Sequence, residues 1–142
     1  MPAEGGEQVQ VTRKGGSNPQ ESADGKRLYY LKGKTGYVSD VWTVPVDGGE
    51  ESLVLEGVCA VNFDVKEQGI YYAEPKYADE TSDENEATLL FYDFATGKAR
   101  PIATILKPVM WGFSVSPDER SIIYPVRESG NRENLMLVEN FR

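Results

Sequence analysis

The sequence predicts an all-β protein built from three repeats, and three observations support this fold class. Short runs of β-branched and aromatic residues recur along the 142-residue chain, each bounded by Gly, Pro, Asp or Asn. No segment keeps a sustained 3.6-residue apolar period, so almost no helix is expected. The chain also resembles itself, because residues 1–7 match residues 44–50 at an offset of 43.

A second repeated pattern surrounds a turn. Residues 22–30, Ser-Ala-Asp-Gly-Lys-Arg-Leu-Tyr-Tyr, match residues 116–124, and residues 67–72 are a degenerate copy that keeps the turn and the aromatic strand. The Asp-Gly and Asp-Glu pairs stand where a hairpin turn needs residues that tolerate the left-handed conformation. The copies end in tyrosines that are 42 and 52 residues apart, namely Tyr30, Tyr72 and Tyr124. The longer interval fits an insertion around the acidic segment 79–86.

These motifs resemble the WD40-like propeller repeat of the PD40 or TolB type. The resemblance rests on the Ser-x-Asp-Gly-Lys-x-Leu-Tyr-Tyr pattern at 22–30, a Val-Trp-Thr-Val-Pro strand at 41–45 and Asp-Gly-Gly-Glu at 47–50. It covers essentially the whole chain, most clearly in the first and third copies. It implies a β-propeller of four-stranded antiparallel blades, with one blade per repeat. It implies a fold and a binding habit, and no particular reaction.

We therefore expect a single propeller segment with three blades, spanning about 17–56, 57–106 and 107–142. Eleven strands are expected within them, at 19–22, 28–31, 41–44, 52–55, 58–65, 70–73, 89–94, 100–105, 111–116, 122–126 and 135–138. A further outer strand, 8–12, precedes the first blade. The third blade is therefore one strand short.

The spare first strand and the incomplete third blade predict how the chain assembles. Propellers have roughly four to eight blades, so three blades cannot close a ring. Two copies supply 3 + 3 = 6 blades, and we expect a homodimer with a two-fold, strand-exchanging interface. The strand that completes the partner's third blade consists of Gln8, Val9, Gln10, Val11 and Thr12. The alternative is a piece of a longer propeller, and the sequence leaves both open.

The composition restricts the chemistry of this chain. With 15 Lys and Arg against 23 Asp and Glu, the net charge is −8, which argues against nucleic acid as a partner. The sequence contains no His, which removes His-based general base catalysis and the Ser-His-Asp arrangement. Cys59 is the only cysteine and is expected to be a buried structural thiol. No cofactor or metal is expected, because an acidic run such as 79–86 is usually a solvated loop.

The predicted function is a non-catalytic propeller scaffold or binding module for a protein, peptide or other ligand. The alternative is a carbohydrate-binding or carbohydrate-active propeller that uses aromatic residues and channel carboxylates, of which Asp64 is the main example on an inner strand. Candidate ligand contacts lie on the rim formed by the loops, at Tyr37, Tyr77, Trp111 and Arg127. No signal peptide or membrane span is apparent, so a soluble, cytoplasmic protein is the default expectation.

Overall fold

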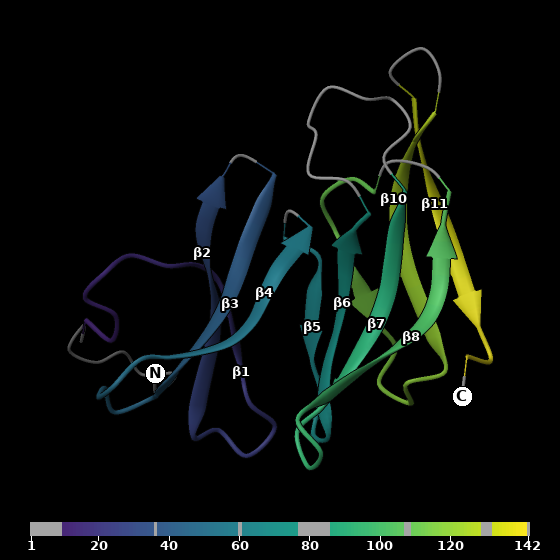
Figure 1. The fold of residues 1–142 in the computed structure, drawn as a ribbon. Helices are drawn as coiled ribbons and strands as arrows, with labels where there is room; N and C mark the ends of the chain where they lie inside the picture. The colour runs from purple at the N-terminus through teal and green to yellow at the C-terminus, as the bar shows by residue number, and fades with distance from the viewer. Residues whose placement is uncertain are drawn as a thin grey trace, which may run out of the picture.

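Three antiparallel sheets stand side by side in the computed structural model (Figure 1). The structure describes residues 10–35, 37–59, 61–76, 86–106, 109–128 and 132–141. Strand order is β1-β2-β3-β4 in the first sheet, β5-β6-β7-β8 in the second and β11-β10-β9 in the third. Strands adjacent in sequence pair within each sheet, so each sheet is an up-and-down meander. We call the three sheets blades 1, 2 and 3.

Each strand falls in or near a segment predicted from the sequence. The bounds in blade 1 are β1 (Ser17–Glu21), β2 (Arg27–Thr35), β3 (Val38–Pro45) and β4 (Ser52–Cys59). Those in blade 2 are β5 (Phe63–Val65), β6 (Gly69–Pro75), β7 (Ala87–Asp93) and β8 (Lys98–Ile105). Those in blade 3 are β9 (Ser114–Val115), β10 (Ser121–Glu128) and β11 (Arg132–Glu139). The described residues form no helix, so the all-β prediction is confirmed.

The turns after β1 and β9 use the same hydrogen bonds, as their matching sequences predict. The Ser22 hydroxyl donates to Asp24 at 2.7 Å and accepts the backbone N–H of Arg27 at 2.9 Å. Ser116 donates to Asp118 in the same way at 2.6 Å. The serine hydroxyl is the main cause that lowers the pKa of each aspartate below its ordinary value.

Two inner strands are shorter than predicted, each next to a glycine with positive φ. The expected strand 58–65 is divided, because residues 58 and 59 extend β4 and only β5 remains as the inner strand. Gly57 lies at φ +76° in this extended part of β4, where the β3–β4 register shifts. The expected strand 111–116 is reduced to β9, since Gly112 at φ +119° takes the chain out of the β conformation.

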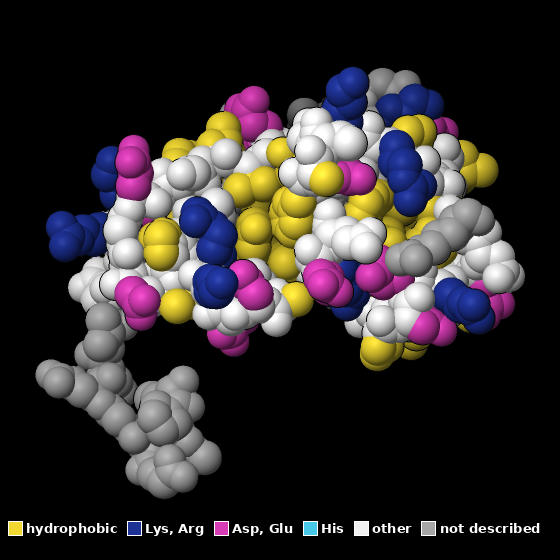
Figure 2. All heavy atoms as spheres, turned by 90° about the horizontal axis from the view of Figure 1, so that it is seen from below, with side chains coloured by type: hydrophobic (Ala, Val, Ile, Leu, Met, Phe, Trp, Pro, Cys, Tyr) yellow, Lys and Arg dark blue, Asp and Glu magenta, His cyan; other side chains and the backbone are white. Residues whose placement is uncertain are grey.

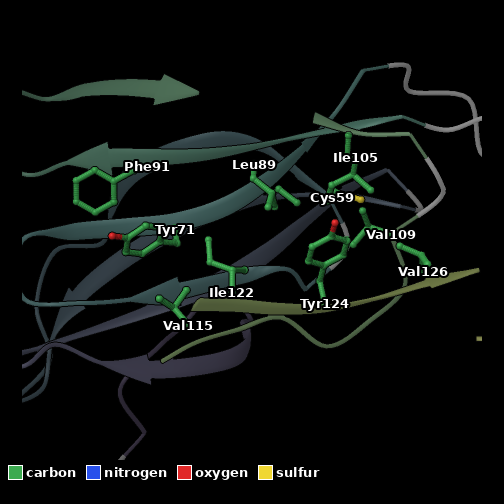
Figure 3. Packing of buried hydrophobic residues seen from close by; sticks show 12 residues of the cluster. Cys59, Tyr71, Leu89, Phe91, Ile105, Val109, Val115, Ile122, Tyr124 and Val126 are labelled. Atoms are coloured by element: carbon green, nitrogen blue, oxygen red, sulfur yellow. The ribbon is translucent and has the colours of Figure 1, made fainter. Parts of the chain in front are cut away.

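The hydrophobic core lies between the blades and forms two clusters. The cluster between blades 1 and 2 includes Tyr29, Leu31, Val41, Phe63, Ile70 and Tyr72. The cluster between blades 2 and 3 includes Tyr71, Leu89, Phe91, Val115, Ile122 and Tyr124 (Figure 3). The sheet faces that meet another blade are therefore buried, and a blade depends on its neighbours for much of its stability.

Successive side chains of a strand point to opposite faces of its blade. We call the face toward the following blade the forward face and the opposite one the rear face. In blade 2, Tyr71 and Leu89 are on the forward face, packed with Ile122 of blade 3, while Ile70 and Tyr72 are on the rear face, packed with blade 1.

The described part of the expected first strand does not form a strand within this single chain. Residues 10–12 have no sheet pairing, and residues 8 and 9 lie outside the described residues. Val11 and Thr12 instead share a hollow of about 210 Å³ with Leu28 and Tyr30 on the rear face of blade 1. The expected pairing partner, β11, lies on the opposite side of the molecule, beyond blade 2 (Figure 1).

Candidate functional site

The inner strands β1, β5 and β9 carry a polar side chain at equivalent positions. Neighbouring strands in this row contact each other, β1 with β5 and β5 with β9. The ladder places Gln20 opposite Tyr29, Asp64 opposite Tyr71, and Ser114 opposite Ile123. Because these three partners are themselves equivalent in the repeats, the polar residues form one row along the inner edge of the blades.

The first two residues of this row connect each blade to the next. The Gln20 amide donates to the carbonyl of Phe63 and accepts the N–H of Val65, both at 2.8 Å. One carboxylate oxygen of Asp64 accepts the N–H of Val115 at 2.7 Å. Asp64, the channel carboxylate noted in the sequence, is therefore bonded to the backbone of blade 3.

Tyr37 lies on the β2–β3 connection and Arg127 near the end of β10, and we call the end of the molecule with these connections the loop end. The Tyr37 hydroxyl donates to the carbonyl of Val109, and the ring packs against the cluster between blades 2 and 3. Burial raises the pKa of the Tyr37 hydroxyl, with a smaller contribution from Cys59, and the charge of Arg127 opposes the shift. Tyr37 is thus a half-buried link between blades as well as a rim residue, while Arg127 is exposed on β10.

The other two predicted rim residues are Trp111 and Tyr77. The side chain of Trp111 is 72% exposed on the connection between β8 and β9. Backbone hydrogen bonds hold this connection, from Met110 to the carbonyl of Pro125 at 2.9 Å and from Gly112 to the Asn62 side chain at 3.2 Å. Tyr77 lies outside the described residues, as does most of the acidic segment.

Below the rim, Cys59 and Asn62 form a buried polar pair of side chains. Burial raises the pKa of the Cys59 thiol, against smaller opposing effects of Tyr37 and Asn62, so the thiol stays protonated at neutral pH. The prediction of a buried cysteine is confirmed. Asn62 is fully buried, and sequence reasoning missed it because nothing around it forms a motif. Among the described residues, no three Cys, Asp or Glu side chains converge on a potential metal site.

The opposite end of the molecule has a hollow of about 540 Å³ between blades 1 and 2. Tyr29 and Phe94 line it and stack with ring centroids 5.6 Å apart, and Arg27 and Lys66 also line it. Figure 2 views this end from below and shows hydrophobic side chains gathered in its middle, flanked by charged ones. No pattern in the sequence indicates this hollow, because it depends on Phe94, a turn residue of blade 2, reaching Tyr29 on a strand of blade 1.

No family profile matches the chain, and no curated protein sequence does. Several solved structures resemble it, including the three that follow. The tricorn protease matches 89% of this chain with 15% identity and a TM-score of 0.57. The acylaminoacyl peptidase of Pyrococcus horikoshii matches 88% with 16% identity and a TM-score of 0.54. The β-propeller domain of the Trilobed protease from Pyrococcus furiosus, described as having an open velcro topology, matches 88% with 18% identity and a TM-score of 0.50.

These likenesses support a β-propeller segment, and they leave the more specific resemblance to the TolB-type repeat as a prediction. This chain covers 12%, 24% and 41% of the tricorn protease, the acylaminoacyl peptidase and the Trilobed protease domain, respectively.

Within the ranges that the structure describes, no helix is long and apolar enough to cross a membrane.

The comparisons also correct the predicted function. A non-catalytic scaffold or binding module for unspecified ligands, with a carbohydrate propeller as the alternative, was expected from the repeats. The three solved structures named above are of peptidases, so these neighbours come from a proteolytic context and do not support the scaffold or the carbohydrate prediction. The error has a physical cause, because the repeat motifs specify turns and strands of a blade and carry no information about what the blade serves.

Proposed function

We propose that this chain supplies blades to a β-propeller that acts together with a peptidase. The observation that carries the proposal is the resemblance over 88–89% of the chain to propellers of three peptidases. The match includes all three blades and so concerns their arrangement as well as the single sheet. At 15–18% identity the match itself concerns the fold, and the proteolytic role is the proposed step beyond it.

In this proposal the residues that cleave the peptide bond lie outside these 142 residues. The chain has no His to act as the base of a Ser-His-Asp arrangement. Its one thiol is 2% exposed, and burial keeps its pKa raised. The blades then serve the peptidase by position, as a wall or passage beside its active site.

The loop end is the side of the propeller that we assign to the peptidase or its peptide substrate. Trp111 is a large exposed aromatic residue and Arg127 an exposed cation, and both residue types are enriched at binding hot spots. Tyr37 fixes the position of the connection that carries Trp111, through its bond to Val109. Rim contacts by these side chains are part of the proposal.

The size of the propeller is a second part of the proposal. Three blades leave two outward sheet faces, and propellers have roughly four to eight blades. Two copies of this chain give six blades, and in this proposal the second copy supplies a fourth strand to the three-stranded sheet of blade 3.

The proteolytic role is tested by retention of peptidase activity. The full chain is immobilised through an affinity tag and exposed to a soluble extract of its source cells, and the bound fraction is assayed with fluorogenic peptide amides. A fluorophosphonate label identifies any retained enzyme with a reactive serine. The matched control column carries Trp111→Ala with Arg127→Ala, which changes the rim and leaves the blades intact.

We expect peptidase activity on the wild-type column and about tenfold less on the control, the effect of one lost hot-spot contact of about 1.4 kcal/mol. A wild-type column that retains no more activity than a column with an unrelated propeller contradicts the proteolytic role.

A further inference from the structure

The forward face of blade 3 has the pattern of an inter-blade interface but no neighbour. By register, Ile123, Leu135 and Leu137 occupy the positions of Tyr71, Leu89 and Phe91 in blade 2. The blade 2 residues are 1%, 0% and 7% exposed, whereas those of blade 3 are 45%, 76% and 54% exposed. Four of the eight exposed large hydrophobic residues in the described chain lie on β10 and β11. Such an apolar face marks a contact surface.

The outer edge of the same blade also has an open position. Blades 1 and 2 have four strands and blade 3 has three, and within the described ranges β11 pairs with β10 alone. An open edge presents backbone groups that can pair with another strand. The same chain carries residues 8–12, which follow the repeated segment 1–7 as residues 51–55 follow segment 44–50, and the described residues 10–12 have no sheet pairing.

We infer that a second copy of this chain covers this face, with its residues 8–12 added to β11 and the rear face of its blade 1 packed on Leu135 and Leu137. The inference rests on the proposed two-copy ring and adds the contact surface and its register. Each chain offers both the incomplete blade and the missing strand, so exchange between two copies satisfies both at once and closes with two-fold symmetry.

The internal repeats define the register of the added strand. Gln10 is equivalent to Leu53 at the 43-residue offset, and Leu53 pairs with Trp42 in blade 1. Trp42 lies opposite Tyr30, as Met136 lies opposite Tyr124, so Trp42 and Met136 are equivalent. Gln10 of one copy therefore pairs with Met136 of the other.

The row of polar residues on the inner strands continues into the same contact. Gln20 and Asp64 each accept a backbone N–H of the next blade, from Val65 and Val115 respectively. Ser114 is the next residue of that row, and the residue of β1 equivalent to Val65 is Glu21. The hydroxyl of Ser114 is thus placed to accept the N–H of Glu21 in the second copy.

The first measurement is the mass of the full chain in solution, by size-exclusion chromatography with light scattering. We expect a dimer of about twice the 15.8 kDa chain mass and no larger species. A monomer at every concentration up to about 100 µM, where a contact of even modest affinity would form, overturns the inference. A ladder of trimers and larger oligomers overturns it as well, because the exchange would not close.

The second measurement identifies the faces by disulfide cross-linking. Chains with Gln10→Cys are mixed with chains with Met136→Cys and oxidised. Opposite residues on antiparallel strands have Cα atoms about 4.5–5.5 Å apart, which a disulfide can span, so we expect a cross-linked pair. The control mixes Gln10→Cys with Leu53→Cys, since Leu53 and Met136 are similarly exposed, at 45% and 41%. Equal cross-linking in the control overturns the inferred register.

A third measurement separates this inference from the proteolytic role. Leu135→Glu places a charge on the inferred contact and leaves the rim unchanged, so the dimer should weaken at least about tenfold. Circular dichroism of the variant establishes that it is folded. A dimer of unchanged affinity overturns the inference whatever the peptidase column shows, and loss of column activity with an intact dimer bears only on the proteolytic role.

Discussion

The forward faces of blades 2 and 3 have equivalent positions and opposite environments. Leu89 of blade 2 is fully buried against blade 3, and Leu135, at the same register position of blade 3, is 76% exposed. The two leucines have the same side chain on the same kind of strand. Their environments differ because only one has a following blade, so burial in this fold is decided by neighbours and not by the repeat itself.

The largest test of this comparison is the pair Leu89→Ala and Leu135→Ala. Leu89→Ala removes a fully buried side chain, and we expect it to lower the free energy of unfolding by about 2–5 kcal/mol. Leu135→Ala should change the free energy of unfolding of the isolated chain by no more than about 0.5 kcal/mol. Urea unfolding at low protein concentration measures both. An equal loss of the free energy of unfolding in both variants would mean that the forward face of blade 3 is covered within the single chain.

A smaller effect is expected for the polar row on the inner strands. Asp64→Ala removes the charged acceptor of the Val115 N–H, and we expect a loss of about 1.5–3 kcal/mol in the free energy of unfolding. Asp64→Asn keeps an acceptor and should cost less. Ser114→Ala, at the equivalent position of blade 3, should fall within about 0.5 kcal/mol in the monomer. If Ser114→Ala lowered the free energy of unfolding of the monomer as much as Asp64→Ala does, Ser114 would already bond a partner within the single chain.

The smallest effect concerns the rear face of blade 1, which carries the ion pair between Lys32 and Glu51. The hydrogen bond from Lys32 is the main cause that lowers the pKa of Glu51 below its ordinary value of 4.5. A lowered folded-state pKa adds stability above the unfolded value, and this contribution is lost as the pH falls through the folded-state pKa. We therefore expect the free energy of unfolding, measured from pH 6 to pH 3, to fall more steeply for the wild type than for Glu51→Gln below pH 4.5. Parallel curves would show that the pair contributes nothing.

Most strands of this fold follow from local patterns in the sequence, and its contacts between blades do not. The Ser22–Asp24 and Ser116–Asp118 turns form as their motifs predict, because those hydrogen bonds join residues two apart. The hydrogen bond from the Gln20 side chain to the carbonyl of Phe63 joins residues 43 apart in two different sheets. No local pattern indicates that a glutamine side chain will reach the backbone of a neighbouring blade. The inner strand of blade 3 was overestimated for a related reason, since Gly112 with its positive φ delays the start of β9.

The candidate site shows the same division between local and distant information. The sequence predicted Tyr37 and Arg127 on the loop end, and the structure places them on the β2–β3 connection and near the end of β10. It did not indicate that Tyr37 packs into the core, because the contact depends on Val109, 72 residues away. Asn62 and the hollow beside Phe94 were missed, since each depends on residues from two blades.

The bond between Tyr37 and Val109 has a consequence for the curvature of the molecule. It joins the β2–β3 connection of blade 1 to the segment that leads into blade 3, so it reaches past the whole of blade 2 at the loop end. Moving the three blades apart at that end would break this bond and expose the tyrosine ring. The angle between blades 1 and 3 is thereby restrained within one chain. A ring that includes these blades would have its radius determined in part by this contact.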